Sequence, residues 1–541
     1  MPGFYVENFG CRATQADGAA LERQFENRGL NRATTVAEAS LVVLNTCSVT
    51  AGADQDARAA IRRVRRKNPQ AKIVVTGCYA QRAPQEIAAL PGVSLVVGNS
   101  HKHKLAEIAL SPSAESVPSG FLALPQLTEN WELRTENSIF VSDIFAHTEL
   151  LAAPVFDAAN ERTRPNLKVQ DGCDNRCSFC VIPFVRGQSR SLGMERILTE
   201  VRTLVNAGYR EVVISGINLG RWGRDLAVDV AGNGNGLPHF SPVLREVGFQ
   251  EAHRGDSRKP KAESRKPALV DLIDAILSRT TLEKLRISSV EPMDWSDELI
   301  SLVASSPRIA KHAHVPMQSG SDAVLRRMHR KYRPWHYREK VEKIRVAMPD
   351  AAIGADVMVG FPGETDAEFE ATRRMIEDLP ITYLHVFTYS ARPGTPAAEM
   401  KNQVPVHVAR ERNRILRELA AEKKLAFMRC FIGRTVEAIT LNVTGSDADG
   451  EFTEALTDNY LKLKLRDRRE ANRWVTARVD NVVDGAVAGS PERLNECGRL
   501  TSTEHVEGIA EKVVPSPNFE NFPLSRPRGQ RPLPSVHRPS E

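Results

Sequence analysis

Three cysteines follow one short apolar strand in the stretch LKVQDGCDNRCSFC, residues 167–180. Cys173, Cys177 and Cys180 have the spacing C-x3-C-x2-C, and no fourth cysteine follows locally. Three thiolates at this spacing can bind three corners of a cubane iron–sulfur cluster, leaving one iron open to a substrate or cofactor. The alternatives are a zinc site completed by a distant histidine, or buried structural thiols. Structural zinc usually uses paired C-x2-4-C knuckles, so the spacing favours a cluster.

The sequence around this motif alternates strand and helix patterns, which predicts an incomplete (β/α)6 barrel over residues 163–400. The motif comes after the first strand, at the carboxyl end where barrel active sites assemble. Residues 225–267 break the pattern with a polar, charged segment that we interpret as a surface insertion. The predicted strands are 167–170, 211–215, 282–288, 313–317, 353–359 and 383–389.

Three further cysteines stand at strand ends in the first 111 residues, where βαβ patterns predict a doubly wound parallel sheet. Cys11, Cys47 and Cys78 each follow an apolar run, and Gly10 and Gly77 precede two of them. The carboxyl ends of parallel strands share one edge, so the sheet is expected to bring the three thiols together. We interpret them as a second three-cysteine cluster site. The alternative is three unrelated buried cysteines. Cys430 and Cys497 do not stand at such strand ends, and we interpret them as structural.

Composition agrees with a soluble, multidomain enzyme. The chain has 541 residues, 41% hydrophobic and 26% charged, with a formal net charge of +6. Eight cysteines are too few for a disulfide scaffold, and no window resembles a membrane span or a signal peptide. A cytoplasmic location without membrane attachment is therefore expected.

The remaining segments are assigned by pattern. Residues 112–162 are expected to be a linker or extension, 401–426 a linking helix, and 491–541 a disordered tail. Residues 427–490 alternate strand-like runs and turns, which predicts a small, OB-like β-barrel. Its basic residues Lys462, Lys464 and Arg466 alternate with leucines, so on a strand they share the outer face, where RNA can bind. A second basic cluster lies on the expected helix 54–67.

These motifs resemble, in order, those of the methylthiotransferases of the radical S-adenosylmethionine (SAM) superfamily. FGCRATQADGAALE (9–22), NTCSVT (45–50), VTGCYAQ (75–81), SGINLG (215–220), HVPMQSGSDAVLRRMHRKY (314–332) and VGFPGET (359–365) carry the resemblance together with the cysteine motif. Thr14 stands where the family usually has asparagine. Residues 431–465 resemble the RNA-binding TRAM domain.

The resemblance implies two [4Fe-4S] clusters and SAM as cofactors. In such enzymes the open iron of the first cluster binds SAM, which is split to a 5′-deoxyadenosyl radical, and the second cluster carries the sulfur. The implied reaction transfers a methylthio group to C2 of N6-threonylcarbamoyladenosine at position 37 of tRNA, with flavodoxin or ferredoxin as reductant. The alternatives are the same reaction on N6-isopentenyladenosine, methylthiolation of a ribosomal-protein aspartate, or an iron–sulfur RNA-binding scaffold without turnover.

Four residues are candidate cofactor contacts. Phe179 is the aromatic residue before the third motif cysteine, and Gly216 permits close approach of a ligand to the backbone after the second barrel strand. Glu291 could bind a ribose hydroxyl or the SAM ammonium, although a helix-capping role is equally open. Gln318 follows the fourth strand and could reach the nucleoside.

Overall fold

The computed structural model describes residues 3–111, 138–147, 163–226, 266–447 and 450–491. The expected insertion and tail lie almost wholly outside the described residues. Residues 1–492 form one compact unit. No helix among the described residues is long and apolar enough to cross a membrane.

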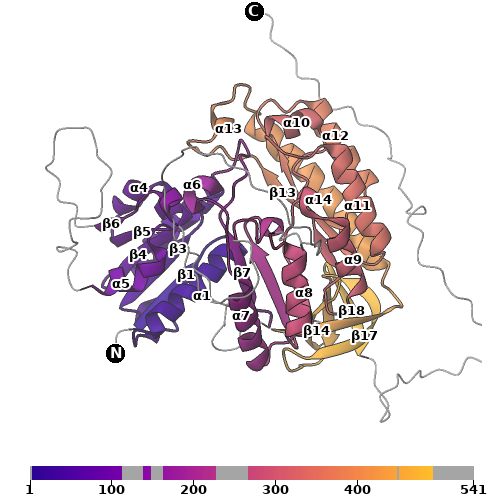
Figure 1. Cartoon of the computed structure of the whole chain (residues 1–541), viewed down its shortest axis with the longest axis horizontal. Helices are drawn as coiled ribbons and strands as arrows, with labels where there is room; N and C mark the ends of the chain where they lie inside the picture. The colour runs from indigo at the N-terminus through magenta and orange to yellow at the C-terminus, as the bar shows by residue number, and fades with distance from the viewer. Residues whose placement is uncertain (1–2, 112–137, 148–162, 227–265, 448–449, 492–541) are drawn as a thin grey trace, which may run out of the picture. The chain divides into compact units, whose positions relative to one another are not determined.

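A six-stranded parallel sheet forms the N-terminal region, with strand order β2-β1-β3-β4-β5-β6. Helices cover both of its faces, as the doubly wound prediction requires (Figure 1). Leu21 and Phe25 of α1 pack on one face with α5, whereas Ile61 and Val64 of α2 pack on the other with α3 and α4. The elements are β1 Gly3–Asn8, α1 Arg12–Glu26, β2 Asn31–Arg32, β3 Leu41–Thr46, α2 Ala51–Lys67, β4 Lys72–Gly77, α3 Cys78–Arg82, α4 Pro84–Ala88, β5 Val93–Gly98, α5 Leu105–Leu110 and β6 Ser138–Phe140.

Strand β6 lies within residues 112–162, the segment for which the sequence predicts a linker or extension. It pairs in parallel with β5, Leu95 opposite Ser138, and so extends the N-terminal sheet. Only three residues form this strand, and an apolar pattern that short cannot be distinguished from a loop by periodicity.

Six parallel strands with outer helices form the central region, as predicted for an incomplete barrel. They lie in two sheets, β10-β9-β7-β8 and β11-β12-β13, joined through the parallel bridge of Leu285 with Ile309. The short β8 is the antiparallel edge strand. The elements are β7 Asn166–Asp171, α6 Ile182–Arg186, β8 Arg190–Ser191, α7 Met194–Asn206, β9 Glu211–Gly216, α8 Leu269–Arg279, β10 Lys284–Ile287, α9 Asp297–Ser305, β11 His312–His314, α10 Asp322–Arg327, α11 Pro334–Ala347, β12 Ala352–Val359, α12 Asp366–Asp378, β13 Tyr383–Thr388, α13 Pro396–Glu399 and α14 Val406–Arg429.

Alternation along these strands separates an apolar outer side from a polar inner side. Leu285, Ala313 and Val357 belong to the core cluster that the outer helices share. Their neighbours Arg286, His314 and Asp356 point to the opposite side, because successive side chains of a strand alternate. His314 and Asp356 meet there, with Nε2 and Oδ1 3.3 Å apart. The interior of the barrel is therefore lined by polar side chains.

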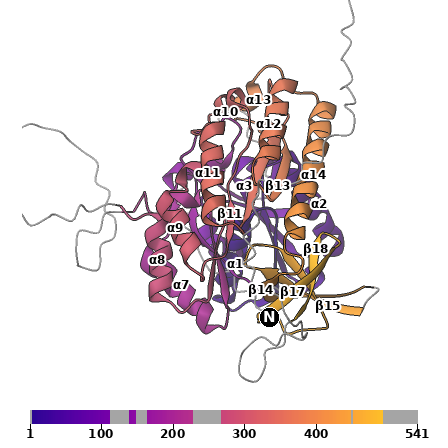
Figure 2. The same cartoon turned by 90° about the vertical axis from the view of Figure 1, so that its right-hand side faces the viewer.

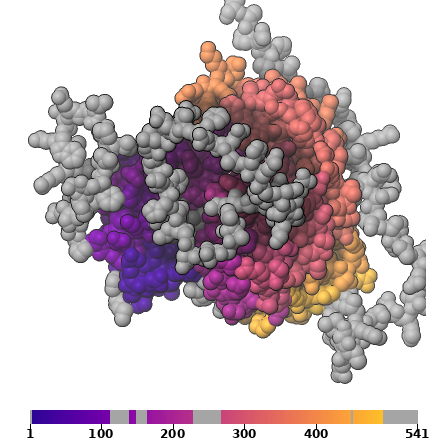
Figure 3. All heavy atoms as spheres, viewed as in Figure 1, coloured from indigo at the N-terminus to yellow at the C-terminus, as the bar shows by residue number. Residues whose placement is uncertain are grey.

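A closed five-stranded barrel, β14-β15-β16-β18-β17, follows the long helix α14 (Figure 2). Phe427 and Met428 at the end of α14 pack into its core with Leu463 and Leu465. Figure 3 shows the surface that the three regions build, in indigo, in magenta to orange, and in yellow. The strands are β14 Thr435–Asp447, β15 Gly450–Thr457, β16 Lys462–Arg466, β17 Trp474–Val483 and β18 Ala486–Pro491.

Candidate active site

Cys11, Cys47 and Cys78 lie at the carboxyl ends of three adjacent parallel strands, β1, β3 and β4. The preceding Gly10 and Gly77 have φ of +98° and +99°, which favour glycine. A Cβ atom on Gly10 would lie 2.5 Å from Cβ of Cys47, so the loop that carries Cys11 passes directly over Cys47. The sheet thus gathers the three thiols as predicted, while their role as cluster ligands stays a prediction.

The motif cysteines occupy the turn between β7 and α6. The backbone N–H of Asn175 donates to Sγ of Cys173 at 3.4 Å, and the N–H of Cys180 donates to the carbonyl of Cys177 at 3.1 Å. Burial raises the pKa of Cys180 to about 12, and the neighbouring Cys177 thiol adds to the rise. Burial likewise raises the pKa of Cys47 to about 11, together with the charge of Cys78. These thiols are therefore protonated at neutral pH unless a metal centre binds them.

The spacing of the sulfur atoms distinguishes a site for an iron–sulfur cluster from a site for a single metal ion. Tetrahedral zinc with a Zn–S bond of about 2.3 Å places its sulfur ligands about 3.8 Å apart. Among the described residues, only His314, Asp356 and His385 have all their ligand atoms within 4.8 Å of one another, so neither cysteine triad is that compact. A four-iron cluster holds its thiolates on separate irons and spaces them more widely. Both triads therefore fit a cluster better than one ion.

Three polar side chains that the sequence analysis did not identify contact the thiols. Nδ2 of Asn99 lies 3.7 Å from Sγ of Cys78, and Nδ2 of Asn218 lies 3.7 Å from Sγ of Cys173. Nη1 of Arg330 donates to Sγ of Cys177 at 3.3 Å. Hydrogen bonds and positive charge at cluster sulfurs raise the reduction potential of a cluster. Asn218 and Arg330 belong to the quoted motifs 215–220 and 314–332, which is the signal that could have identified them.

A buried network of ion pairs joins the two cysteine-bearing regions. Asp17 of α1 pairs with Lys102, with Lys168 of β7 and with Arg186 of α6, and all four are nearly inaccessible to solvent. Lys168 and Arg186 also pair with Asp171, at 2.8 and 2.9 Å. The network holds three cations and two carboxylates, so one positive charge remains. Arg186 also interacts electrostatically with Cys78 and Cys11.

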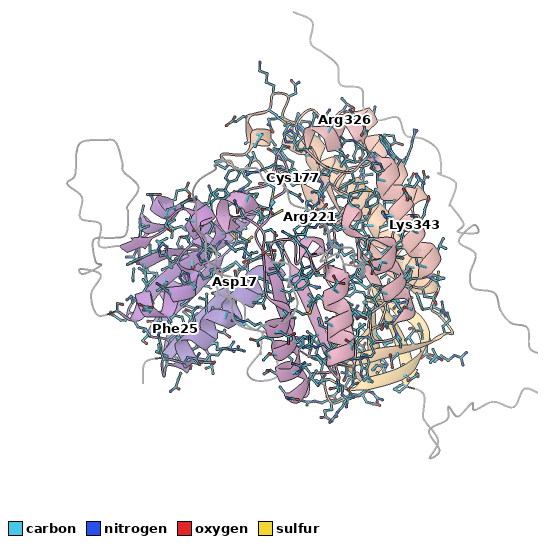
Figure 4. The ribbon with its side chains drawn as sticks, in the orientation of Figure 1. Asp17, Phe25, Cys177, Arg221, Arg326 and Lys343 are labelled. Atoms are coloured by element: carbon cyan, nitrogen blue, oxygen red, sulfur yellow. The ribbon has the colours of Figure 1, made fainter. Side chains whose placement is uncertain are left out.

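The predicted cofactor contacts lie around the motif but differ in what they touch. Glu291 forms an ion pair with Arg330, and both line a cavity with Cys177 and Arg221. Figure 4 labels Cys177 and Arg221 near the carboxyl ends of the barrel strands. The structure therefore places Glu291 beside a motif cysteine, with its carboxylate already paired.

The other three candidates have structural partners. Phe179 packs against Phe361 with ring centroids 6.4 Å apart. A Cβ atom on Gly216 would lie 2.8 Å from Oε1 of Gln170, so that side chain occupies the space the glycine leaves. Gln318 has φ of +62°, and its backbone N–H and C=O both bond to β12. A non-glycine residue in this conformation is uncommon and is found at functional sites.

The basic residues of β16 lie on the outer face of the small barrel, as the alternation predicts. Leu463 and Leu465 are fully buried between them. Each basic side chain also pairs with a carboxylate of a neighbouring strand or turn. The pairs are Lys462 with Glu454 at 3.1 Å, Lys464 with Asp484 at 3.2 Å and Arg466 with Asp447 at 2.8 Å.

Two family models match the chain. Residues 167–376 match the Radical SAM superfamily, and residues 3–98 match a model described as Uncharacterized protein family UPF0004. The chain is therefore a radical SAM enzyme, a class that uses SAM and a [4Fe-4S] cluster.

Curated relatives match most of the chain. Threonylcarbamoyladenosine tRNA methylthiotransferase MtaB of Aquifex aeolicus (strain VF5) is 33% identical over 471 residues, 87% of this chain and 98% of the relative. The MtaB protein of Bacillus subtilis (strain 168) is 34% identical, covering 84% and 89%. The tRNA-2-methylthio-N(6)-dimethylallyladenosine synthase of Saccharopolyspora erythraea is 31% identical, covering 89% and 85%. The chain belongs to the radical SAM tRNA methylthiotransferase family.

Proposed function

We propose that this enzyme transfers a methylthio group to C2 of N6-threonylcarbamoyladenosine at position 37 of tRNA. The observation that carries the proposal is the pairing of two cysteine triads, one at the edge of each α/β region, through the charge network of Asp17, Lys168 and Arg186. A scaffold that only bound RNA would not need two thiol triads on segments that one buried ion-pair network connects.

The six cysteines are the proposed ligands of two [4Fe-4S] clusters, with Cys173, Cys177 and Cys180 holding the cluster that binds SAM. When bound, these groups supply the reductive cleavage of SAM and the sulfur that is transferred. The protein's own residues hold the thiolates in place: Asn99, Asn218 and Arg330 each bond one sulfur.

The comparison with relatives favours the threonylcarbamoyl acceptor over isopentenyl. Relatives named for the threonylcarbamoyl reaction reach 33–34% identity over 84–87% of the chain. A relative named for the dimethylallyladenosine reaction reaches 31% identity over 89% of the chain.

The small barrel is the proposed tRNA-binding module, similar to a TRAM domain. Exposed ion pairs contribute little stability, so the β16 basic residues can exchange their carboxylate partners for phosphates. The proposed domain limits are 1–111, 163–400 and 427–490. We also propose that flavodoxin or ferredoxin supplies the low-potential electrons, and that the enzyme acts on tRNA in the cytoplasm.

Mass spectrometry of tRNA nucleosides from cells lacking this gene tests the proposal. We expect 2-methylthio-N6-threonylcarbamoyladenosine to disappear and its unmethylthiolated precursor to accumulate, and the wild-type gene to restore the product. Loss of the isopentenyl derivative instead would assign the second acceptor. Unchanged nucleosides would exclude both.

A further inference from the structure

Two histidines and an aspartate meet on the inner side of three adjacent barrel strands. His314 ends β11, Asp356 lies in β12, and His385 lies in β13, directly opposite Asp356 in the strand register. The intervening Ala313, Ala355 and Val386 face the apolar core instead. Parallel pairing therefore projects all three polar side chains toward the barrel interior.

The distances between these side chains match the edges of a metal coordination sphere. Nε2 of His314 lies 3.3 Å from Oδ1 of Asp356, and Nδ1 of His385 lies 3.2 Å from the same oxygen. With metal–ligand bonds of about 2.0–2.1 Å, two ligands of a tetrahedral ion lie about 3.3 Å apart. No other group of three His, Cys, Asp or Glu residues among the described part of the chain is equally compact.

The ring of His314 is held through one nitrogen and presents the other to Asp356. Its side chain is 7% exposed, and its Nδ1 lies 2.7 Å from the hydroxyl of Ser289. Its Nε2 is buried and lies 3.3 Å from Oδ1 of Asp356, without a hydrogen bond of favourable geometry among the described residues. A histidine that bonds a second group through one ring nitrogen and leaves the other free is the usual arrangement around a metal.

The charge balance also suits a cation. Asp356 supplies the carboxylate of the group, and its Oδ1 is the atom that a nitrogen of each imidazole faces. The nearby cation Arg286 is paired with Glu211 at 2.7 Å, which offsets its charge. His385 is 55% exposed, so an ion could enter from its side and keep open positions there.

We propose that His314, Asp356 and His385 bind a divalent transition-metal ion at a site separate from both cysteine triads. Two histidines and one carboxylate select ions such as Zn²⁺, Fe²⁺, Co²⁺ or Mn²⁺ and leave coordination positions free. Ser289 is a positioning residue that fixes the ring of His314.

Titration of the full, cluster-reconstituted chain with Mn²⁺ tests this site, because thiolates bind Mn²⁺ poorly and oxidised four-iron clusters give no EPR signal. The EPR signal of free Mn²⁺ should report one bound ion per chain, displaced by added Zn²⁺. His385→Ala and Asp356→Asn should weaken binding at least tenfold. Ser289→Ala should weaken it by about tenfold, the usual effect of losing a residue that orients a ligand.

The matched control is His407→Ala, which removes an exposed histidine at the start of α14 and should bind Mn²⁺ as the wild type does. Iron content measured on each variant reports whether the fold and the clusters persist. Absence of Mn²⁺ binding by the wild type would overturn the proposal. The three side chains would then only form hydrogen bonds with one another. Equal binding by the wild type and His385→Ala would also overturn it.

Discussion

Arg186 donates a hydrogen bond of 2.9 Å to Asp17, and both side chains are buried. Arg186 ends α6, the helix after the cysteine motif, whereas Asp17 lies in the first helix, which begins right after Cys11. One ion pair thus connects the two segments that carry the proposed clusters. The residues are 169 positions apart, so this contact forms only when the N-terminal sheet and the barrel pack together.

Asp17→Asn should destabilise the protein at neutral pH. It leaves Lys168 and Arg186 paired with Asp171 and removes the carboxylate that pairs with Lys102. Removing one partner of a buried ion pair costs about 3–5 kcal/mol. Urea denaturation at pH 7 measures the loss. The matched control Asp56→Asn, on the exposed side of α2, should change stability little.

The effect of Asp17→Asn should also depend on pH. Burial raises the pKa of Asp17, but Lys102, Lys168 and Arg186 lower it well below its usual range. An aspartate whose pKa is lower in the folded state stabilises the fold above its unfolded pKa of about 3.9. Wild type and variant should therefore differ most near neutral pH and converge as pH falls below about 4. A constant difference down to pH 3 would contradict this role for the Asp17 charge.

Arg330→Gln should lower the reduction potential of the cluster held by the motif cysteines. The guanidinium of Arg330 lies 3.3 Å from Sγ of Cys177, and its positive charge stabilises the more negative, reduced cluster. The substitution removes this charge. We expect a shift of several tens of millivolts, since about 60 mV corresponds to a tenfold change for one electron. EPR-monitored potentiometry measures it. Arg326→Gln, which alters an exposed arginine paired with Asp322, is the control and should leave the potential unchanged.

The two cysteine triads should be separable by mutation. Changing Cys173, Cys177 and Cys180 to alanine should remove about half of the iron and abolish SAM cleavage, because only these thiols are proposed to hold the open iron that binds SAM. Changing Cys11, Cys47 and Cys78 should also remove half of the iron but preserve reductive formation of 5′-deoxyadenosine. Iron analysis and chromatography of the nucleosides test both. Loss of SAM cleavage in both variants would show that the sites are not independent.

Replacing Lys462, Lys464 and Arg466 with alanine should weaken tRNA binding and flatten its salt dependence. Removing one cation that neutralises a phosphate makes the negative slope of log affinity against log salt less steep by about 0.7–0.9. Filter binding at several salt concentrations measures the slope, while SAM cleavage without tRNA should persist. An unchanged slope would reject this face of β16 and favour the basic helix α2. Arg62, Arg66 and Lys67 would then be the residues to replace.

Patterns within a single element were predictable from the sequence. The run Leu41–Leu44 predicted β3, and the apolar period of Asp366–Leu379 predicted α12, because burial of one side sets the period of each element. Strand-end placement also predicted that Cys11, Cys47 and Cys78 meet, since parallel strands end at one edge. Local pattern does not reveal that α1 begins at Arg12, where Asn166 of β7 donates to the backbone carbonyl of Arg12.

Contacts between distant elements were not predictable. The strand pattern shows Lys168 only as a polar residue within β7. Its burial against Asp17 depends on how α1 packs against the barrel. His314, Asp356 and His385 meet only because β11, β12 and β13 pair in one register. The sequence likewise did not reveal that Glu291 pairs with Arg330, since the partners come from different loops.

The most direct measurement is product formation by the reconstituted enzyme. The chain is incubated with SAM, a low-potential reductant and tRNA carrying N6-threonylcarbamoyladenosine or N6-isopentenyladenosine at position 37. Nucleosides are then analysed by mass spectrometry. We expect 2-methylthio product from the threonylcarbamoyl tRNA and none from the Cys11, Cys47 and Cys78 alanine variant. Product from the isopentenyl tRNA alone, or from the variant, would contradict the proposed acceptor or the proposed role of the N-terminal cysteines.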